Sequence, residues 1–160
     1  MTEGGDPDRI DLIRLFPEGR LAMGRLEAAV RGGGLDPRLL ELVRVRCSQL
    51  NGCAFCLDMH TKDARALGET EQRLYGLAAW REAPFYSPRE RSALAVAEAV
   101  TRPDRGPLPD ALVAEARGHF TEAELACLVY AVVAINAWNR LAVAGRFPVG
   151  GHRAGPAPPA

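Results

Sequence analysis

Two adjoining stretches decide the fold of this chain: DPRLLELVRVRCSQLNG at residues 36–52 and CAFCLDMHTKDARAL at residues 53–67. The first begins with Asp36-Pro37, a helix start, because aspartate caps free backbone N–H groups and proline fits the first helical position. Apolar residues then recur at helical spacing, which predicts an amphipathic helix. Asn51-Gly52 ends it, since both residues tolerate the left-handed conformation that closes helices. The second stretch is predicted to form the next helix.

Similar helix signals run through the rest of the chain. Capping boxes, in which a hydroxyl residue is followed three positions later by glutamate, begin helices at Ser87 and Thr121. The alternating apolar pattern of β-strands between turn residues does not occur in the sequence. We therefore predict an all-α fold, a single-domain helical bundle of six or seven helices over residues 10–147. Residues 1–9 are predicted to form a flexible arm and residues 148–160 a disordered tail.

The composition narrows the classes of function. The 160 residues suit one domain, and 20 basic side chains balance 20 acidic ones, so the chain lacks the basic footprint of nucleic-acid binding. Its first residues lack the pattern of a signal peptide, and the longest apolar run, Leu125 to Ile135, is too short to span a bilayer. We therefore expect a cytoplasmic protein with neither a nucleic-acid nor a membrane partner.

Two cysteines and a histidine share one face of the second predicted helix. At 3.6 residues per turn, Cys56 lies about 60° from Cys53, and His60 lies about 20° from Cys53 on the same side. Two thiols one turn apart can close a disulfide, and the imidazole can take up a proton. Because both thiols lie in the first turn, the helix dipole predicts that they are more acidic than a free cysteine.

Other interpretations of the cysteines stay open at this point. Free cysteine is often buried, so the pair could serve packing alone. Cys47, Cys53, Cys56 and His60 could form a zinc set, but Cys47 lies across the helix break and no second Cys-x-x-Cys follows. A thioredoxin-type motif needs a βαβ pattern, which the sequence lacks. We expect neither a metal nor an organic cofactor.

Glu41 is the fourth candidate site residue. It precedes Cys53 by twelve residues, on the helix that leads into the break. A helical hairpin could bring its carboxylate beside the thiols, whereas a glutamate on an amphipathic helix is usually just solvated. The remaining cysteines and histidines are expected to be structural or peripheral: Cys47 and Cys127 in the core, His119 in a loop and His152 in the tail.

Taken together, these residues resemble a known family. Glu41, the run Cys53-Ala54-Phe55-Cys56 and then His60 are similar to the core motif of AhpD-like alkylhydroperoxidases, in the carboxymuconolactone decarboxylase family. The resemblance covers about residues 35–147. It includes three further segments, Arg65–Glu71, Ser87–Leu94 and Asn136–Arg140.

The resemblance implies an all-α fold that assembles as trimers or hexamers. It also implies reduction of hydroperoxides through a reversible Cys53–Cys56 disulfide, with a lipoyl-type or thioredoxin-like dithiol as the reductant. Better-studied relatives carry a histidine at the place of Phe55, so this chain lacks one member of that proton relay. Relatives that decarboxylate lactones generally lack the paired cysteines, so that activity is not expected here.

Two points about the chemistry are left as hypotheses. The helix dipole favours Cys53 as the attacking thiol, whereas pairing with His60 and the family resemblance favour Cys56, which we prefer. The alternative to an enzyme is a non-catalytic helical oligomer in which the cysteine pair senses redox state or only packs. Turnover distinguishes the two, because a sensor is oxidised once whereas an enzyme consumes peroxide repeatedly.

Overall fold

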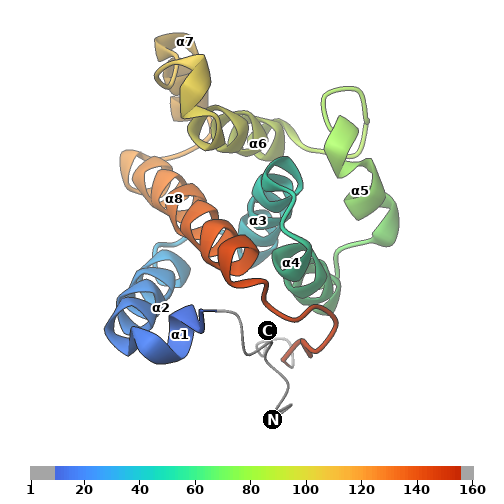
Figure 1. Ribbon diagram of the computed structural model, residues 1–160. Helices are drawn as coiled ribbons and strands as arrows, with labels where there is room; N and C mark the ends of the chain where they lie inside the picture. Colours follow the sequence, from blue (N-terminus) through green and yellow to red (C-terminus); the bar gives the residue numbers. More distant parts are fainter. Residues whose placement is uncertain (1–9, 156–160) are drawn as a thin grey trace.

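A computed structural model describes residues 10–155, and within this range the chain is helical, with no strand (Figure 1). The α-helices are α1 (Leu12–Leu15), α2 (Pro17–Arg31), α3 (Pro37–Asn51), α4 (Ala54–Ala66), α5 (Glu71–Gly76), α6 (Pro88–Thr101), α7 (Asp110–Arg117) and α8 (Glu122–Gly145). Two 3-10 helices, η1 (Leu77–Ala79) and η2 (Pro103–Arg105), complete them. The predicted all-α class is confirmed. The helix count exceeds the prediction because α1 is a single turn capped by Asp11, too short to show a periodic pattern.

The helix ends follow the local signals in the sequence. The Asp36 side chain accepts the first free N–H of α3, and Gly52 closes that helix in the left-handed conformation, at φ 64°. Both predicted capping boxes are formed, one at the start of α6 and one at the start of α8. In each box, the hydroxyl and the glutamate side chain each accept a hydrogen bond from a backbone N–H group that would otherwise lack a partner. These two bonds set where the helix begins.

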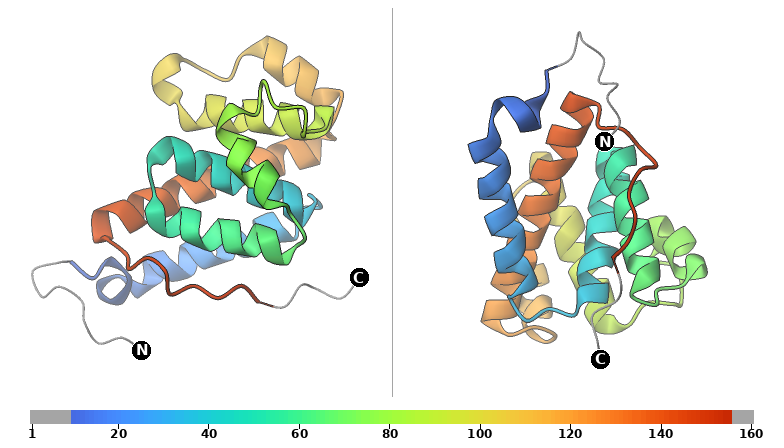
Figure 2. Two further views of the ribbon diagram at one scale, coloured as in Figure 1. Left: turned by 90° about the vertical axis from the view of Figure 1, so that its right-hand side faces the viewer. Right: turned by 90° about the horizontal axis from the view of Figure 1, so that it is seen from below.

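Helix α3 lies at the centre of the molecule. It contacts α4, α6 and α8, which surround it in both views of Figure 2. Its apolar residues therefore enter two cores, one shared with α8 and one shared with α5 and η1. The sequence predicts an amphipathic helix with one apolar face. In the structure the buried surface of α3 is wider, because every residue from Leu39 to Val45 is buried, including Glu41 and Arg44.

Helix α8 is the only one between residues 10 and 155 that is long and apolar enough to cross a membrane. In the structure, 44% of its most apolar window is buried inside the protein. It packs there against α2, α3 and α6. These contacts account for its apolar character as a central helix of the bundle.

The two chain ends were predicted to be flexible. Residues 1–9 and 156–160 lie outside the described part of the chain. Residues 148–155 form no helix or strand, but they run back along α4 (Figure 2). Hydrogen bonds join this segment to α4, for example from the backbone N–H of Gly150 to Asp58.

The buried Cys47 thiol makes stability depend on pH in the alkaline range. Burial raises its pKa from 9.0 to about 12, against the lowering effect of the Thr101 hydroxyl that donates to its sulfur. Between these values the unfolded chain releases a proton that the folded chain keeps, so rising pH favours unfolding by up to about 1.4 kcal/mol per pH unit. Urea unfolding of the wild type and Cys47→Ala at several pH values tests this. The stability cost of the substitution should shrink above about pH 9, whereas a constant cost would contradict the prediction.

Candidate active site

The turn at Gly52 places both thiols of the Cys-x-x-Cys motif at the start of α4. Cys53 is the N-cap residue, and its sulfur accepts a hydrogen bond from the backbone N–H of Cys56 at 3.4 Å. Both side chains are buried, and both are free thiols. The sequence expectation that the pair lies in the first turn is confirmed. The two sulfurs differ in what they face.

Cys56 and His60 face a cavity of about 420 Å³, whereas Cys53 lies outside its wall. The cavity lies among α2, α3, α4 and α8. Its polar side holds Glu41, which α3 contributes. Its apolar side is formed by Ile13, Phe55, Met59, Trp138, Ala142 and Phe147. The structure therefore brings three of the four predicted site residues to one cavity and leaves the fourth, Cys53, beside it.

A chain of buried polar contacts lines the polar side of this cavity. Glu41 Oε2 lies 2.7 Å from His60 Nδ1, and Glu41 Oε1 accepts from Arg44 Nη1 at 2.6 Å. Arg44 Nη2 in turn donates to Glu27 on α2 at 2.7 Å. Sequence reasoning missed Arg44 and Glu27. The spacing of three between Glu41 and Arg44 was a usable signal, because such residues are neighbours on a helix.

These contacts set the charge of Glu41 and the orientation of His60. Burial on its own would raise the pKa of Glu41, but His60 and Arg44 outweigh it and the pKa is lowered. Glu41 is therefore ionised, and its carboxylate can only accept hydrogen bonds. It follows that His60 Nδ1 carries a hydrogen and donates it to Glu41. The other ring nitrogen, Nε2, is left to exchange a proton with a neighbour.

The predicted acidity of the Cys56 thiol is wrong. Burial raises its pKa from 9.0 to about 12, and the neighbouring Cys53 raises it as well, against a lowering effect of Asn139. The backbone N–H of Cys56, at the helix start, donates to the Cys53 sulfur. Cys56 thus keeps its proton at neutral pH, and its reaction needs a base such as His60.

The polar groups of the site do not suit a metal ion. Glu41, His60 and Asp63 are the only cluster of three or more such donors in residues 10–155, with donor atoms within 4.8 Å of one another. Each oxygen of Glu41 already accepts a hydrogen bond, and the charge of Arg44 beside one of them opposes a second cation there. The zinc set considered from the sequence does not form either, since the Cys47 sulfur accepts from Thr101 on α6.

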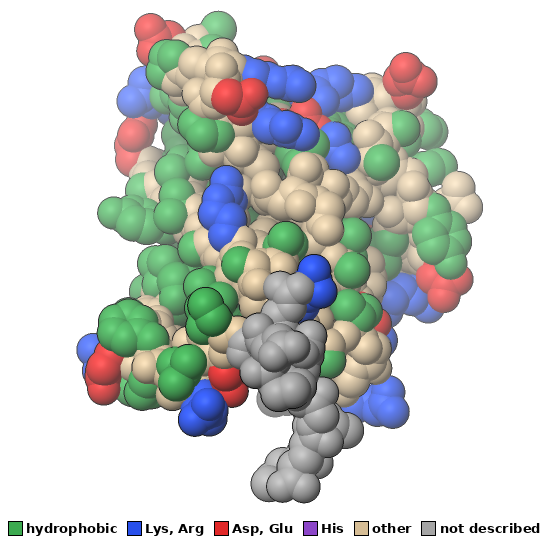
Figure 3. Space-filling model, viewed as in Figure 1, with side chains coloured by type: hydrophobic (Ala, Val, Ile, Leu, Met, Phe, Trp, Pro, Cys, Tyr) green, Lys and Arg blue, Asp and Glu red, His purple; other side chains and the backbone are tan. Residues whose placement is uncertain are grey.

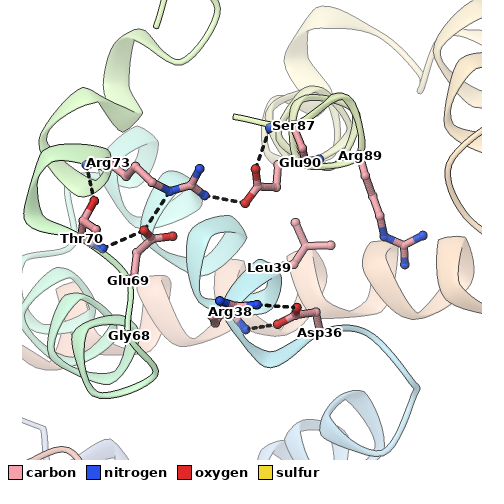
Figure 4. Close-up of a pocket in the computed structure, with 10 residues that line it drawn as sticks. All are labelled: Asp36, Arg38, Leu39, Gly68, Glu69, Thr70, Arg73, Ser87, Arg89 and Glu90. Atoms are coloured by element: carbon pink, nitrogen blue, oxygen red, sulfur yellow. Dashed lines mark hydrogen bonds and ion pairs between the residues drawn. The ribbon is translucent and has the colours of Figure 1, made fainter. Parts of the chain in front are cut away.

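A second cavity, of about 470 Å³, lies between the starts of α3, α5 and α6 (Figure 4). It is lined mainly by charged side chains, and Figure 4 shows Arg73 held between Glu69 and Glu90. Arg73 and Arg38 pair with carboxylates that line the same cavity, and Arg89 pairs with Glu124 outside it. Neither a cysteine nor a histidine lines the cavity. The chemistry of the thiols is therefore confined to the first cavity.

Residues 17–99 match the model of the carboxymuconolactone decarboxylase family. The chain belongs to this family. A further relative is the uncharacterised protein YdfG of Bacillus subtilis, which is 43% identical over 136 residues, or 85% of this chain and 92% of the relative. These matches confirm the family resemblance seen in the sequence.

Solved structures of AhpD-like proteins share the fold of this family member. A protein of unknown function from Agrobacterium tumefaciens, with a suggested role as antioxidant defence protein AhpD, superposes with a TM-score of 0.85 at 38% identity. The alignment covers 90% of this chain and 99% of that one. An alkylhydroperoxidase AhpD core protein from Ralstonia eutropha superposes with a TM-score of 0.77 at 21% identity, covering 87% of this chain and 74% of that one. The second likeness shows the fold alone.

Proposed function

We propose that this protein is a thiol-dependent peroxidase that reduces hydroperoxides through a reversible Cys53–Cys56 disulfide. The observation that carries the proposal is the position of Cys56. It shares the cavity with the Glu41–His60 pair, and the Cys53 sulfur accepts a hydrogen bond from its backbone N–H. Membership of the family and the AhpD-like fold support a peroxidase-related role. The apolar wall of the cavity suits the organic part of an alkyl hydroperoxide.

The first step of the proposed cycle takes place at Cys56. His60 Nε2 accepts the thiol proton, and Glu41 stabilises the imidazolium that forms. The thiolate sulfur attacks the terminal oxygen of ROOH, so that an S–O bond forms and the O–O bond breaks. The departing alkoxide takes the proton back from His60 and leaves as ROH. Cys56 is then oxidised to a sulfenic acid, and the peroxide is reduced.

The later steps return the thiols to their starting state. The Cys53 sulfur attacks the sulfenic acid, an S–S bond forms, and the hydroxyl group leaves with the Cys53 proton as water. An external dithiol, of the lipoyl or thioredoxin type, then reduces this disulfide by exchange and is itself oxidised to a disulfide. A dithiol donor is abundant in a reducing compartment, so we propose that the protein acts in the cytoplasm.

We also propose that the chain forms a homo-oligomer, a trimer or a hexamer. Hydrophobic side chains gather on the side of the molecule where α8 and α2 lie (Figure 3). The exposed hydrophobic residues of these two helices include Tyr130 and Val133 on α8 and Leu21 on α2, each at least 46% exposed. An apolar face of this kind favours a protein partner. Light scattering measures the assembly, and a monomer at micromolar concentration would contradict this proposal.

Steady-state peroxide consumption tests the function directly. Purified protein is mixed with cumene hydroperoxide and either dihydrolipoamide or a thioredoxin system. We expect many turnovers per chain, and a loss of about 10²- to 10⁴-fold in His60→Gln, because a general base typically contributes that much. His119→Gln, outside the site, is the matched control. Oxidation that stops at one equivalent per chain would instead favour the redox sensor.

A further inference from the structure

The end of the chain brings a second histidine next to the site. After Phe147, which packs edge to face on Phe55 at 5.3 Å, the chain runs along α4 (Figure 2). Lys62 on α4 donates to the backbone carbonyl of His152 at 3.3 Å. The His152 ring lies with its Nε2 2.7 Å from Oδ1 of Asp63, also on α4. These contacts hold His152 in place against α4.

Asp63 connects this histidine to the cavity. It lies three residues after His60 on α4 and lines the same cavity as His60 and Cys56. A carboxylate oxygen of Asp63 is within 4.8 Å of a ring nitrogen of His60 and of a Glu41 carboxylate oxygen. Asp63 and His60 form no direct hydrogen bond within the described residues, and a separation of up to 4.8 Å leaves room for one bridging water. Asp63 thus contacts His152 and also lies near His60.

The two outer residues of this path are more exposed to solvent than the two inner ones. The side chains of Glu41 and His60 are 8% and 10% exposed, whereas those of Asp63 and His152 are 30% and 25% exposed. On its other side, the Glu41–His60 pair ends at Arg44, whose guanidinium cannot accept a proton. The direction through Asp63 therefore leads from the buried base toward solvent.

We propose that Asp63 and His152 form a proton relay between His60 and solvent, so that the tail of the chain supplies a residue to the active site. This inference rests on the proposed function, in which His60 exchanges a proton with Cys56. When an external dithiol breaks the disulfide, the departing thiolate needs a proton, and the relay delivers one through His60. When the Cys56 thiol reacts with a reagent that takes no proton, the proton of that thiol passes to His60, and the relay carries it to solvent. Asp63 and His152 touch neither sulfur nor peroxide and act through His60.

The neighbouring charges leave His152 as the partner of Asp63. Near the relay, Lys62 pairs with Asp58 at 2.7 Å and Arg65 lies 3.9 Å from Glu71. The other titratable or charged groups that line the cavities beside it are Arg20, Glu27 and Arg31 from α2, Glu41 and Arg44 from α3, Cys56 from α4, Tyr75 from α5 and Arg153 from the tail. Removing the His152 ring would leave the Asp63 carboxylate without this hydrogen-bond partner beside His60. That carboxylate would then favour the charged form of the His60 ring.

The first test measures the reactivity of Cys56 against pH, with no peroxide present. Iodoacetamide is the probe, and mass spectrometry quantifies modified Cys56. In His152→Ala the midpoint of the rate profile should move upward by about half to one pH unit, the size expected for one nearby charge. In Asp63→Asn it should move downward. His119→Ala, an unrelated histidine, should match the wild type. Profiles of His152→Ala and Asp63→Asn that match the wild type would overturn the relay.

The second test measures turnover with cumene hydroperoxide and dihydrolipoamide. We expect kcat to fall about tenfold in His152→Ala, less than for a group that acts directly. Added imidazole should restore it, and His152→Gln should be equally slow because an amide cannot pass a proton. A structural anchor would behave differently: His152→Gln would be active, and imidazole would not rescue His152→Ala. That outcome would overturn the proposal. If the wild type shows no turnover, the peroxidase function fails and the alkylation profile alone decides the proton link.

Discussion

Cys56→Ser is expected to abolish peroxide turnover, with a loss of at least about 10³-fold, because it removes the nucleophile itself. Cys53→Ser should stop the cycle one step later. Its Cys56 can still attack the peroxide, but no thiol is left to form the disulfide, so a sulfenic acid accumulates. The different positions of the two sulfurs give this asymmetry, since Cys56 faces the cavity and Cys53 lies outside its wall.

Mass spectrometry after one equivalent of cumene hydroperoxide separates these outcomes. The wild type should lose two hydrogens, and Cys53→Ser should gain one oxygen at Cys56 that dimedone traps. Cys127→Ser is the control, because Cys127 is outside the cavity and its thiol donates to the Val30 carbonyl. Sulfenic acid found only when Cys56 is replaced and Cys53 retained would make Cys53 the attacking thiol. If neither thiol reacts faster than free cysteine, the peroxidase proposal fails.

Arg44→Met is expected to lower the free energy of unfolding by about 3–5 kcal/mol, the usual cost of removing one partner from a buried ion pair. Arg44 is 5% exposed and binds Glu27 and Glu41, themselves 13% and 8% exposed. Without the guanidinium, two carboxylates would stay close together in a poorly solvated place. Urea unfolding at neutral pH measures the effect.

Two comparisons make this prediction specific. Arg117→Met removes an ion pair with Glu122 that is largely exposed, so it should cost less than about 1 kcal/mol. Adding Glu27→Gln to Arg44→Met should recover part of the loss, because it removes one of the two unpaired charges. The deficit of Arg44→Met should also shrink in mild acid, where a carboxylate that has lost its cation can take up a proton. A deficit as small as that of Arg117→Met would show that the buried network contributes little.

Several features of the site could be predicted from the sequence, because they depend on neighbours along the chain. Asp36-Pro37 and Asn51-Gly52 end or begin helices through contacts within a few residues, and the structure confirms both. The same break places Cys53 and Cys56 at the start of α4. The spacing of Glu41, Cys53, Cys56 and His60 also supported the family assignment, which the match to residues 17–99 confirms.

The acidity of Cys56 was decided by the tertiary structure alone. The sequence places this thiol at a helix start, which favours a thiolate, but burial within the bundle outweighs that effect. The pairing of Arg44 with Glu27, and of His152 with Asp63, joins residues 17 and 89 positions apart. A helix end depends on hydrogen bonds between close neighbours, so the sequence determined it. Burial and ion pairing depend on which distant segments exclude water from a group, and that is settled only when the helices pack.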